Sequence, residues 1–354
     1  MHAVGEGTMR AFWLFGAGIG AILAALAGMT AARADETADF YRTHPVSIVV
    51  GHEAGTGYDM YARVLARHFG ARLTGTPLVD VRNMPGASAM VAANWLYNLA
   101  PRDGSVIATF AHTVVFEPLV GDNAARFEAR KFTWLGNLEE GSPICGVSAQ
   151  SGIDSFGALL NHETVFGASG VGAGGPLVQS PNAVRVLTGA KIRVVQGYRG
   201  SYDIKLAMDR GEVSGICGLS YSTIKTEWRD MLDSGRFRVI LQLGLKPNPE
   251  LAGVPRIYDY ARTDEDRQVF DLIFGVQALG RLYVGPPGLP AARTAALQKA
   301  LMEAAKDPAF LADAQTAGLD LTISDAAAVE KLVEGFYAAT PLATARAKRA
   351  IRGE

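Results

Sequence analysis

Short apolar segments alternate with amphipathic segments along most of this chain, and this alternation limits the possible folds more than any other feature. Runs of β-branched and other apolar residues predict strands at residues 46–50, 78–81, 106–110, 144–147, 164–166, 192–195, 213–217, 239–243 and 282–284. Apolar residues at helical spacing predict helices at residues 61–73, 90–99, 204–209, 223–232, 293–306 and 326–339. Such alternation predicts an α/β fold with largely parallel sheets.

Length and charge narrow the class of protein further. The chain has 354 residues, of which 49% are hydrophobic and 19% are charged, so it can bury a large core and is long enough for two domains. Its formal net charge is -1. Because nucleic-acid-binding proteins usually carry a basic excess, we expect no nucleic-acid partner.

The first 34 residues have the pattern of a secretory signal peptide. Arg10 precedes an uncharged apolar stretch over residues 11–32, and the small-x-small pattern at residues 32–34 supplies a cleavage point. We therefore expect cleavage after residue 34 and a periplasmic mature protein, with Met1 or Met9 as the true start. An uncleaved membrane anchor is the alternative, because an apolar stretch of this length can span a bilayer.

Two cysteines, Cys145 and Cys217, are present. In an exported protein such a pair can form a disulfide. Both cysteines also lie in apolar, strand-like segments, where buried free thiols are common. The sequence leaves both states open.

Catalytic and cofactor motifs are incomplete. The glycine turn at residues 55–57 lacks the third glycine of a dinucleotide fingerprint and the lysine of a P-loop. Ser169 fails the nucleophile-elbow pattern, because Val171 stands where that pattern requires glycine. Neither His52 nor His162 has a second histidine four places later, as a zinc-binding helix requires. We therefore expect no enzymatic activity, no cofactor and no metal site.

Loops rich in glycine and hydroxyl residues follow several predicted strands and favour ligand binding. In open α/β sheets, ligands collect at the carboxyl ends of the strands. Residues 167–176 hold many small side chains, so their backbone N–H groups stay approachable and suit a carboxylate. Residues 197–201 add a ring, a guanidinium and a hydroxyl. The structural alternatives are a flexible surface loop for the first segment and a solvated charge for Arg199.

Several of these loops together resemble the substrate-binding proteins of tripartite tricarboxylate transporters, the Bug or TctC-like family. The loop GHEAGTGYD at residues 51–59 corresponds to the family pattern P-F-x-A-G-G-x-x-D. The other matching segments are RNMPGASA (82–89) for E-N-R-P-G-A-G-G, PRDGS (101–105) for P-x-D-G-Y, ASGVGA (168–173) for S-S-G-x-G-S, QGYRG (196–200) for V-P-Y-R-G and MDRGEVS (208–214) for L-x-x-G-x-V-D. Their order and spacing agree over residues 40–320.

The resemblance implies a two-lobed α/β periplasmic binding protein of type II, the Venus-flytrap class, with its ligand cleft between the lobes. After the signal peptide at residues 1–34, it implies a first lobe at residues 35–138 plus 263–354 and a second lobe at residues 139–262. It further implies a monomer that captures a small organic anion, a carboxylate, and delivers it to the membrane permease subunits of a transporter. A periplasmic receptor for a two-component sensor is the alternative function.

We expect the ligand contacts to lie in loops of both lobes. The expected ligand-binding residues are His52, Gly55, Thr56, Gly57, Tyr58, Asp59, Ser88, His112, Ser169, Gly170, Gly172, Tyr198, Arg199, Gly200 and Ser201. Asp59 is expected to reach the ligand directly or through water. Gly51 and His52 replace a proline and a phenylalanine of the family pattern, and Thr56 replaces a glycine, so the resemblance does not imply a particular ligand.

Overall fold

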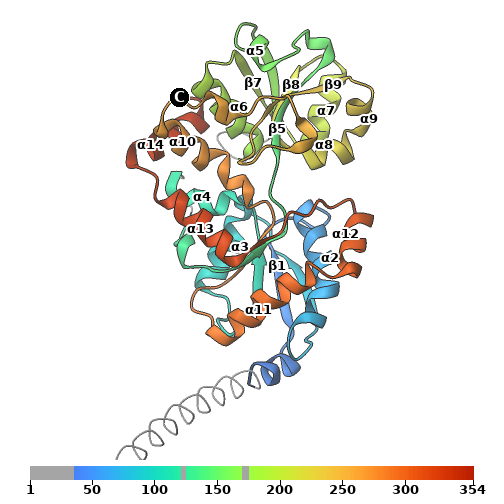
Figure 1. Ribbon diagram of the computed structural model, residues 1–354, viewed down its shortest axis with the longest axis vertical. Helices are drawn as coiled ribbons and strands as arrows, with labels where there is room; N and C mark the ends of the chain where they lie inside the picture. Colours follow the sequence, from blue (N-terminus) through green and yellow to red (C-terminus); the bar gives the residue numbers. More distant parts are fainter. Residues whose placement is uncertain (1–35, 121–124, 170–174) are drawn as a thin grey trace, which may run out of the picture.

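The predicted strands form two separate β-sheets that lie in different halves of the molecule (Figure 1). The structure is a computed structural model that describes residues 36–120, 125–169 and 175–354. The signal peptide predicted at residues 1–34 lies outside the described residues. Within the described residues, every helix is too short or too polar to cross a membrane.

The first sheet combines strands from both ends of the chain. Its strands are β1 (Val46–Val50), β2 (Val79–Asn83), β3 (Val106–Thr109), β4 (Thr133–Asn137), β10 (Leu282–Gly285) and β11 (Ser324–Asp325), in the order β11-β4-β10-β3-β1-β2. Strand β1 pairs in parallel with β2 and β3, whereas β10 lies antiparallel between β3 and β4. All residues of β1 are buried, which explains its continuous apolar sequence.

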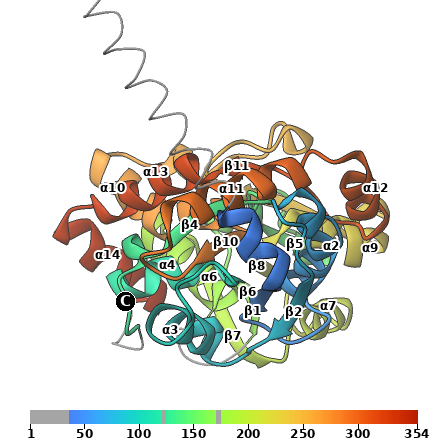
Figure 2. The same cartoon turned by 90° about the horizontal axis from the view of Figure 1, so that it is seen from below.

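Helices cover both faces of this first sheet. They are α2 (Gly57–Arg72), α3 (Met90–Asn98), α4 (Thr113–Val120), α11 (Ala291–Ala304), α12 (Pro308–Thr316) and α13 (Ala326–Tyr337). Ile48 packs in a core with Leu65 of α2 and Leu301 of α11, while Val49 packs in a second core with Leu96 of α3. Seen from below, α2 and α11 accordingly lie on one side of the sheet and α3 and α4 on the other (Figure 2).

The second sheet is formed by the middle of the chain. Its strands are β5 (Pro143–Ser148), β6 (Thr164–Ser169), β7 (Ile192–Tyr198), β8 (Gly215–Ser220) and β9 (Phe237–Gln242), in the order β7-β6-β8-β5-β9. The helices of this half are α5 (Phe156–Leu159), α6 (Pro176–Thr188), α7 (Ser201–Asp209), α8 (Tyr221–Glu227) and α9 (Arg229–Asp233). Strand β6 pairs in parallel with β7 and β8, but β5 is antiparallel to both of its neighbours.

The predicted α/β class is confirmed, but the expectation of largely parallel sheets is wrong. Both sheets are mixed, because β5 and β10 run against their neighbours. The chain reaches each of these two strands by passing from one sheet to the other. It therefore enters the sheet at the opposite end from a strand that follows a helix of the same half, and runs in the opposite direction. Strands β4 and β11 were not predicted. Gly136 and Asn137 interrupt the apolar pattern of β4, and β11 has only two residues.

The last helices connect the two halves of the molecule. Helix α14 (Pro341–Arg352) packs against α6 and against α10 (Asp264–Ile273). Asn182 and Arg185 of α6 donate hydrogen bonds to the carbonyl oxygens of Ile351 and Gly353, at 3.2 and 2.7 Å. Helix α14 therefore contacts the half that contains the second sheet, and α10 packs on α14, although both helices fall within the range predicted for the first lobe. The lobe boundaries stay a prediction.

Cys145 and Cys217 form a disulfide. They lie opposite each other on the adjacent antiparallel strands β5 and β8, and both are fully buried. The sequence is compatible with either a disulfide or two free thiols, and the structure contains the disulfide. The bond joins two strands of the second sheet that are 72 residues apart in the chain.

Candidate functional site

The loop after β1 is held in place by the carboxylate of Asp59. Asp59 is only 3% exposed, and its Oδ2 accepts hydrogen bonds from Gly55 N and Arg63 Nε, both at 2.8 Å. Its Oδ1 accepts from Asn83 Nδ2 at 2.9 Å. Burial opposes ionisation of Asp59, but these hydrogen bonds outweigh it and lower the pKa of the carboxyl. Both oxygens are thus engaged by protein donors, and the expected contact of Asp59 with a ligand stays a prediction.

Helix α2 begins at this loop without a side-chain cap. Thr56 is the N-cap residue, but its hydroxyl donates to Glu53 O at 2.8 Å and does not cap the first turn. Gly55 has a φ of 83°, a conformation that favours glycine and turns the chain into the helix. By contrast, Asp325 and Thr340 cap α13 and α14 with their side chains. The N-cap side chain therefore leaves the first turn of α2 uncapped, and the carboxylate of Asp59 in that turn opposes the positive end of the helix dipole.

Two tyrosines of α2 hold a guanidinium. The His52 ring stacks on the Tyr58 ring, with centroids 4.0 Å apart and planes 6° apart. The guanidinium carbon of Arg281 lies 4.4 Å from the centroid of Tyr58 and 4.8 Å from that of Tyr61. Since His52 occupies one face of Tyr58, the guanidinium lies over the other face. These contacts bring two distant segments of the chain together at one edge of the first sheet.

Arg281 was not among the residues expected at this site, because Arg281 lies directly before the antiparallel strand β10 rather than after a strand. Candidate binding residues were sought after strand ends, and the structure places His52 after β1 and His112 after β3. Strand β10 runs antiparallel to β3, so its first residues lie at the edge where β3 ends. A Cβ atom on Gly57 would lie 3.0 Å from Arg281 Nη2, so the absence of a side chain at Gly57 lets the guanidinium approach the start of α2. Only the direction of β10 could have revealed this arrangement.

Glu139 is the carboxylate nearest to Arg281. Its Oε2 lies 3.3 Å from Arg281 Nη1, and its side chain is 4% exposed. Its Oε1 accepts a hydrogen bond from Ser222 Oγ at 3.3 Å, which connects the segment after β4 with helix α8. Burial raises the pKa of Glu139, and the charge of Arg281 only partly offsets that effect. Glu139 therefore links the guanidinium at the first sheet to a helix of the second sheet.

His52 and His112 are uncharged at neutral pH. Burial lowers the pKa of His52 to about 4 and that of His112 to about 3, and the nearby charge of Arg281 contributes to both shifts. The Nδ1 atoms of both rings are buried and have no hydrogen-bond partner among the described residues. The two imidazoles thus add polar groups to this edge without adding positive charge.

These shifts predict a loss of stability in mild acid. For a histidine whose folded pKa is depressed, the stabilising contribution is present above the unfolded pKa of about 6.5 and is lost as the pH falls toward the folded value. We therefore expect the melting temperature to fall between pH 6.5 and about 4, and to fall less steeply in a His52→Phe/His112→Asn variant. Thermal denaturation followed by circular dichroism measures both slopes, with the exposed His162→Gln as control. Equal slopes for parent and double variant would contradict the prediction.

The structure brings together the expected residues at the ends of β6 and β7. Ser169 and Tyr198 are paired across these parallel strands. Gly200 is the N-cap residue of α7, and Ser201 is the first residue of that helix. Gly170 and Gly172 lie outside the described residues. Ser88 lies in the short 3₁₀ turn Ala87–Ala89, and its side chain is outside the described part of the structure.

Arg199 has the character of a solvated charge. Its side chain is 89% exposed, and its guanidinium donates to both carboxylate oxygens of Asp203, at 2.7 and 3.1 Å. Asp203 lies in the first turn of α7, where its negative charge also interacts favourably with the helix dipole. In this structure the positive charge of Arg199 is already paired.

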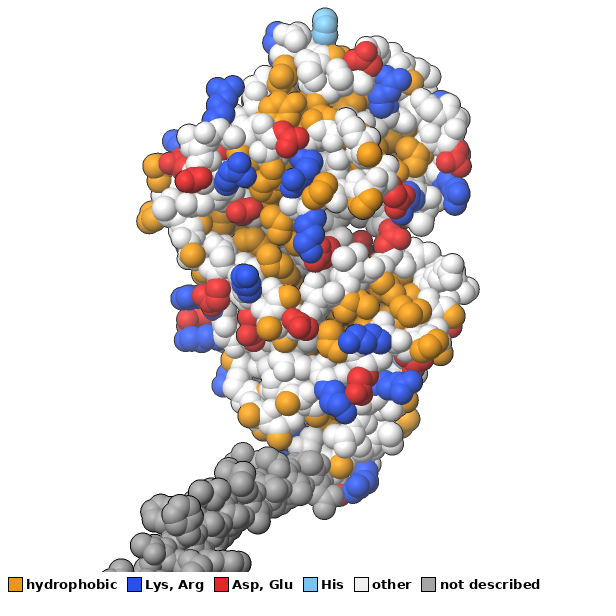
Figure 3. Space-filling model, viewed as in Figure 1, with side chains coloured by type: hydrophobic (Ala, Val, Ile, Leu, Met, Phe, Trp, Pro, Cys, Tyr) orange, Lys and Arg blue, Asp and Glu red, His pale blue; other side chains and the backbone are white. Residues whose placement is uncertain are grey.

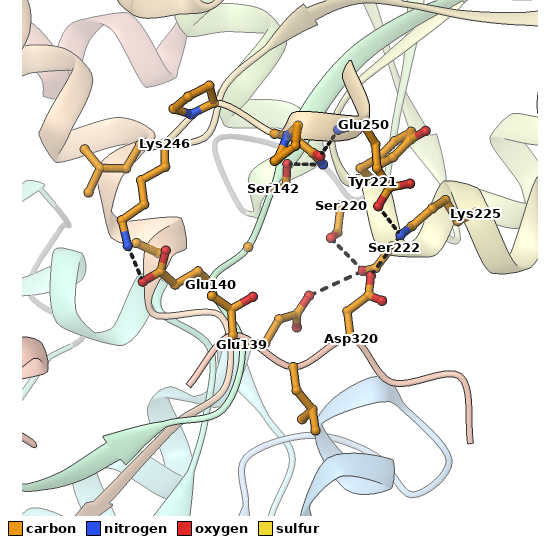
Figure 4. Close-up of a pocket in the computed structure, with 18 residues that line it drawn as sticks. Glu139, Glu140, Ser142, Ser220, Tyr221, Ser222, Lys225, Lys246, Glu250 and Asp320 are labelled. Atoms are coloured by element: carbon orange, nitrogen blue, oxygen red, sulfur yellow. Dashed lines mark hydrogen bonds and ion pairs between the residues drawn. The ribbon is translucent and has the colours of Figure 1, made fainter. Parts of the chain in front are cut away.

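A cavity of about 340 Å³ lies between the two halves beside Glu139 (Figure 4). Its lining side chains are mainly hydroxyl and charged groups, and those labelled in the figure are Glu139, Glu140, Ser142, Ser220, Tyr221, Ser222, Lys225, Lys246, Glu250 and Asp320. Lys246 pairs with Glu140, and Lys225 pairs with Glu250. None of the expected ligand-binding residues lines this cavity. It therefore adjoins the cluster around Arg281 and shares Glu139 with it.

Charge on the visible face is mixed. Basic and acidic side chains are interspersed over both halves, and the surface is hollowed between them (Figure 3). A large basic patch would be needed to hold a polyanion such as nucleic acid. The surface in this view lacks such a patch.

Comparisons with known proteins agree with this architecture. No family model matches the chain. A Cupriavidus necator protein described as "UPF0065 protein in gbd 5′region" is 24% identical over 259 residues, which cover 70% of this chain and 73% of that protein. A TctC solute-binding protein from Polaromonas, solved without ligand, superposes with a TM-score of 0.66 and 16% identity, covering 88% of this chain and 99% of that one.

A second solved structure is similar to a comparable extent. It is a Rhodopseudomonas palustris protein with adipate, with a TM-score of 0.62, 19% identity and coverage of 86% of this chain and 97% of that one. At these identities the structures establish the fold, and the Cupriavidus necator relative adds similarity of sequence. The resemblance to the Bug and TctC-like periplasmic binding proteins that the loop motifs predict is therefore confirmed by fold and by sequence.

Proposed function

We propose that this protein is an extracytoplasmic solute-binding protein that captures a small organic anion, a carboxylate, for a transporter of the tripartite tricarboxylate type. The observation that carries the proposal is the set of polar groups at the carboxyl ends of strands in both sheets. His52 and His112 follow β1 and β3, and Ser169 and Tyr198 end β6 and β7. Such strand ends are where α/β sheets bind ligands.

The chemistry of these groups supports binding rather than catalysis. Hydroxyl, imidazole and backbone N–H donors suit an anion. The lobes would close around the ligand by a hinge movement without any covalent step. The adipate in the Rhodopseudomonas palustris structure supports a carboxylate as the ligand class. The predicted signal peptide supports a periplasmic location.

A thermal-shift screen of the mature protein tests the ligand class. We expect one or more mono-, di- or tricarboxylates, aromatic acids or amino acids to raise the melting temperature. At a concentration of about one hundred times the dissociation constant, binding adds about 2.7 kcal/mol, which corresponds to a shift of about 5 °C for a chain of this size. Stabilisation by sugars or cationic compounds alone would contradict the proposal.

Transport is tested in cells with the acid that gives the largest shift. Its uptake should be lost when the gene is deleted and restored when the parent protein is supplied. Unchanged uptake, combined with loss of a transcriptional response to the same acid, would instead favour a receptor for a sensor.

A further inference from the structure

The positive charge of Arg281 is only partly compensated by the side chains around it. Its side chain is 19% exposed, and its one carboxylate contact among the described residues is the 3.3 Å approach of Glu139. Nη1 donates to Gly280 O at 2.7 Å, whereas Nε is buried and has no hydrogen-bond partner among the described residues. A guanidinium offers five N–H donors in a fork that matches a carboxylate with two parallel hydrogen bonds. Glu139 does not make that two-bond contact.

The groups packed around Arg281 add little negative charge. Its Nη2 lies against Gly57, the first residue of α2, where Asp59 in the first turn opposes the helix dipole, so the guanidinium itself supplies the positive charge. The neighbouring imidazoles of His52 and His112 carry no negative charge that could compensate it. Tyr58 and Tyr61 contact the cation with their ring faces, and a side-chain hydrogen bond also joins Arg281 to Tyr58.

We propose that Arg281 binds a carboxylate of the ligand through two hydrogen bonds and thereby selects organic acids over uncharged compounds of the same shape. Glu139 competes with the ligand for the guanidinium. This inference rests on the proposed function, because it specifies how the same cleft would recognise its anion. Asp59 and Arg199 are then not the charges that decide selectivity, since each is already paired within its own segment.

The proposal predicts opposite effects for two neighbouring substitutions. Glu139→Gln keeps the acceptor for Ser222 but removes the competing charge, so we expect tighter binding of a carboxylate, by roughly threefold or more. Glu139→Gln/Arg281→Gln removes both charges together, which avoids leaving a buried carboxylate alone. We expect it to bind the acid roughly ten to a hundred times more weakly than the parent, since charge-assisted hydrogen bonds are strong.

The matched control is Arg256→Gln. Arg256 is a second guanidinium that lies over a tyrosine, Tyr258, at 5.2 Å, and its Nε also lacks a partner among the described residues. It follows β9 and is not among the residues around α2. We expect Arg256→Gln to bind the acid as the parent does.

Isothermal titration of all four proteins with adipate, hexanoate, malate and citrate, and with adipamide as the uncharged analogue of adipate, decides the matter. Circular dichroism first establishes that each variant is folded. Loss of binding in the double variant with tighter binding in Glu139→Gln supports the proposal. If the parent binds an acid and the double variant binds it equally well, the role of Arg281 is wrong while the proposed function stands. If the parent binds adipamide and none of the acids, both fail.

Discussion

Arg281→Met is expected to lower the free energy of unfolding by about 3–5 kcal/mol at neutral pH. The substitution removes the cation but leaves Glu139, whose side chain is 4% exposed, with uncharged hydroxyl groups such as that of Ser222 in place of a compensating charge. An isolated buried carboxylate loses its hydration without gaining a compensating charge, and this penalty accounts for most of the expected loss. Urea denaturation of parent and variant measures the difference.

The companion variant Glu139→Leu/Arg281→Met distinguishes a charge effect from a packing effect. Because both charges are then absent, we expect its stability to lie within about 1–2 kcal/mol of the parent. A double variant as unstable as Arg281→Met would show that the contacts of the guanidinium with Tyr58 and Tyr61 matter more than the charge.

Acidity should partly rescue Arg281→Met. A carboxyl whose folded pKa is raised stabilises the protein below its unfolded pKa, and that stabilisation is lost as the pH rises through the folded value. Burial already raises the pKa of Glu139 in the parent, and removing Arg281 raises it further. The difference from the parent, measured at equal pH, should therefore shrink as the pH falls toward the unfolded value.

Gly218→Ala is expected to destabilise the protein by about 3 kcal/mol or more. Gly218 of β8 has a φ of 94°, which an alanine adopts only at a cost. The added Cβ would also lie 2.5 Å from Pro176 O and 2.6 Å from Ser180 Oγ, so the start of α6 would have to move. Because α6 follows the loop of the expected Ser169 site, ligand binding should weaken as well.

Gly197→Ala is the matched control for Gly218→Ala. Gly197 has a φ of 105°, but a Cβ there would have no neighbour within 4 Å. It therefore carries the backbone cost alone, about 1–2 kcal/mol. Comparing the two melting temperatures isolates the effect of the contact with α6. Equal losses would mean that α6 shifts freely and that Gly218 is not a constraint.

Local chemistry made most elements predictable from the sequence. The apolar run of β1, the glycine turn after it and the helical spacing of α2 specify a strand, a loop and a helix, and the structure has all three. The ends of β6 and β7 were likewise predictable, because small and polar residues follow apolar ones. In each case the residues that determine the local structure are neighbours in the sequence.

Arrangements that depend on distant segments were not predictable. Nothing near Arg281 in the sequence shows that its guanidinium reaches the start of α2, since that contact depends on β10 entering the sheet antiparallel to β3. Glu139 stands next to a second acid in the sequence, a pattern typical of a solvated turn, but contacts with distant segments bury it. The state of Cys145 and Cys217 was open because only strand register brings the two residues together.

The position of β10 has a consequence for the order of folding. Leu282 pairs with Asn137 and Val284 pairs with Ala108, so β10 fills the space between two strands made much earlier in the chain. Until residue 285 is available, β3 has one unpaired edge and β4 lacks both of its partners, and such edges promote association between incomplete chains. Contacts between residues so far apart also slow folding. Completion of the first sheet is therefore a late and slow event.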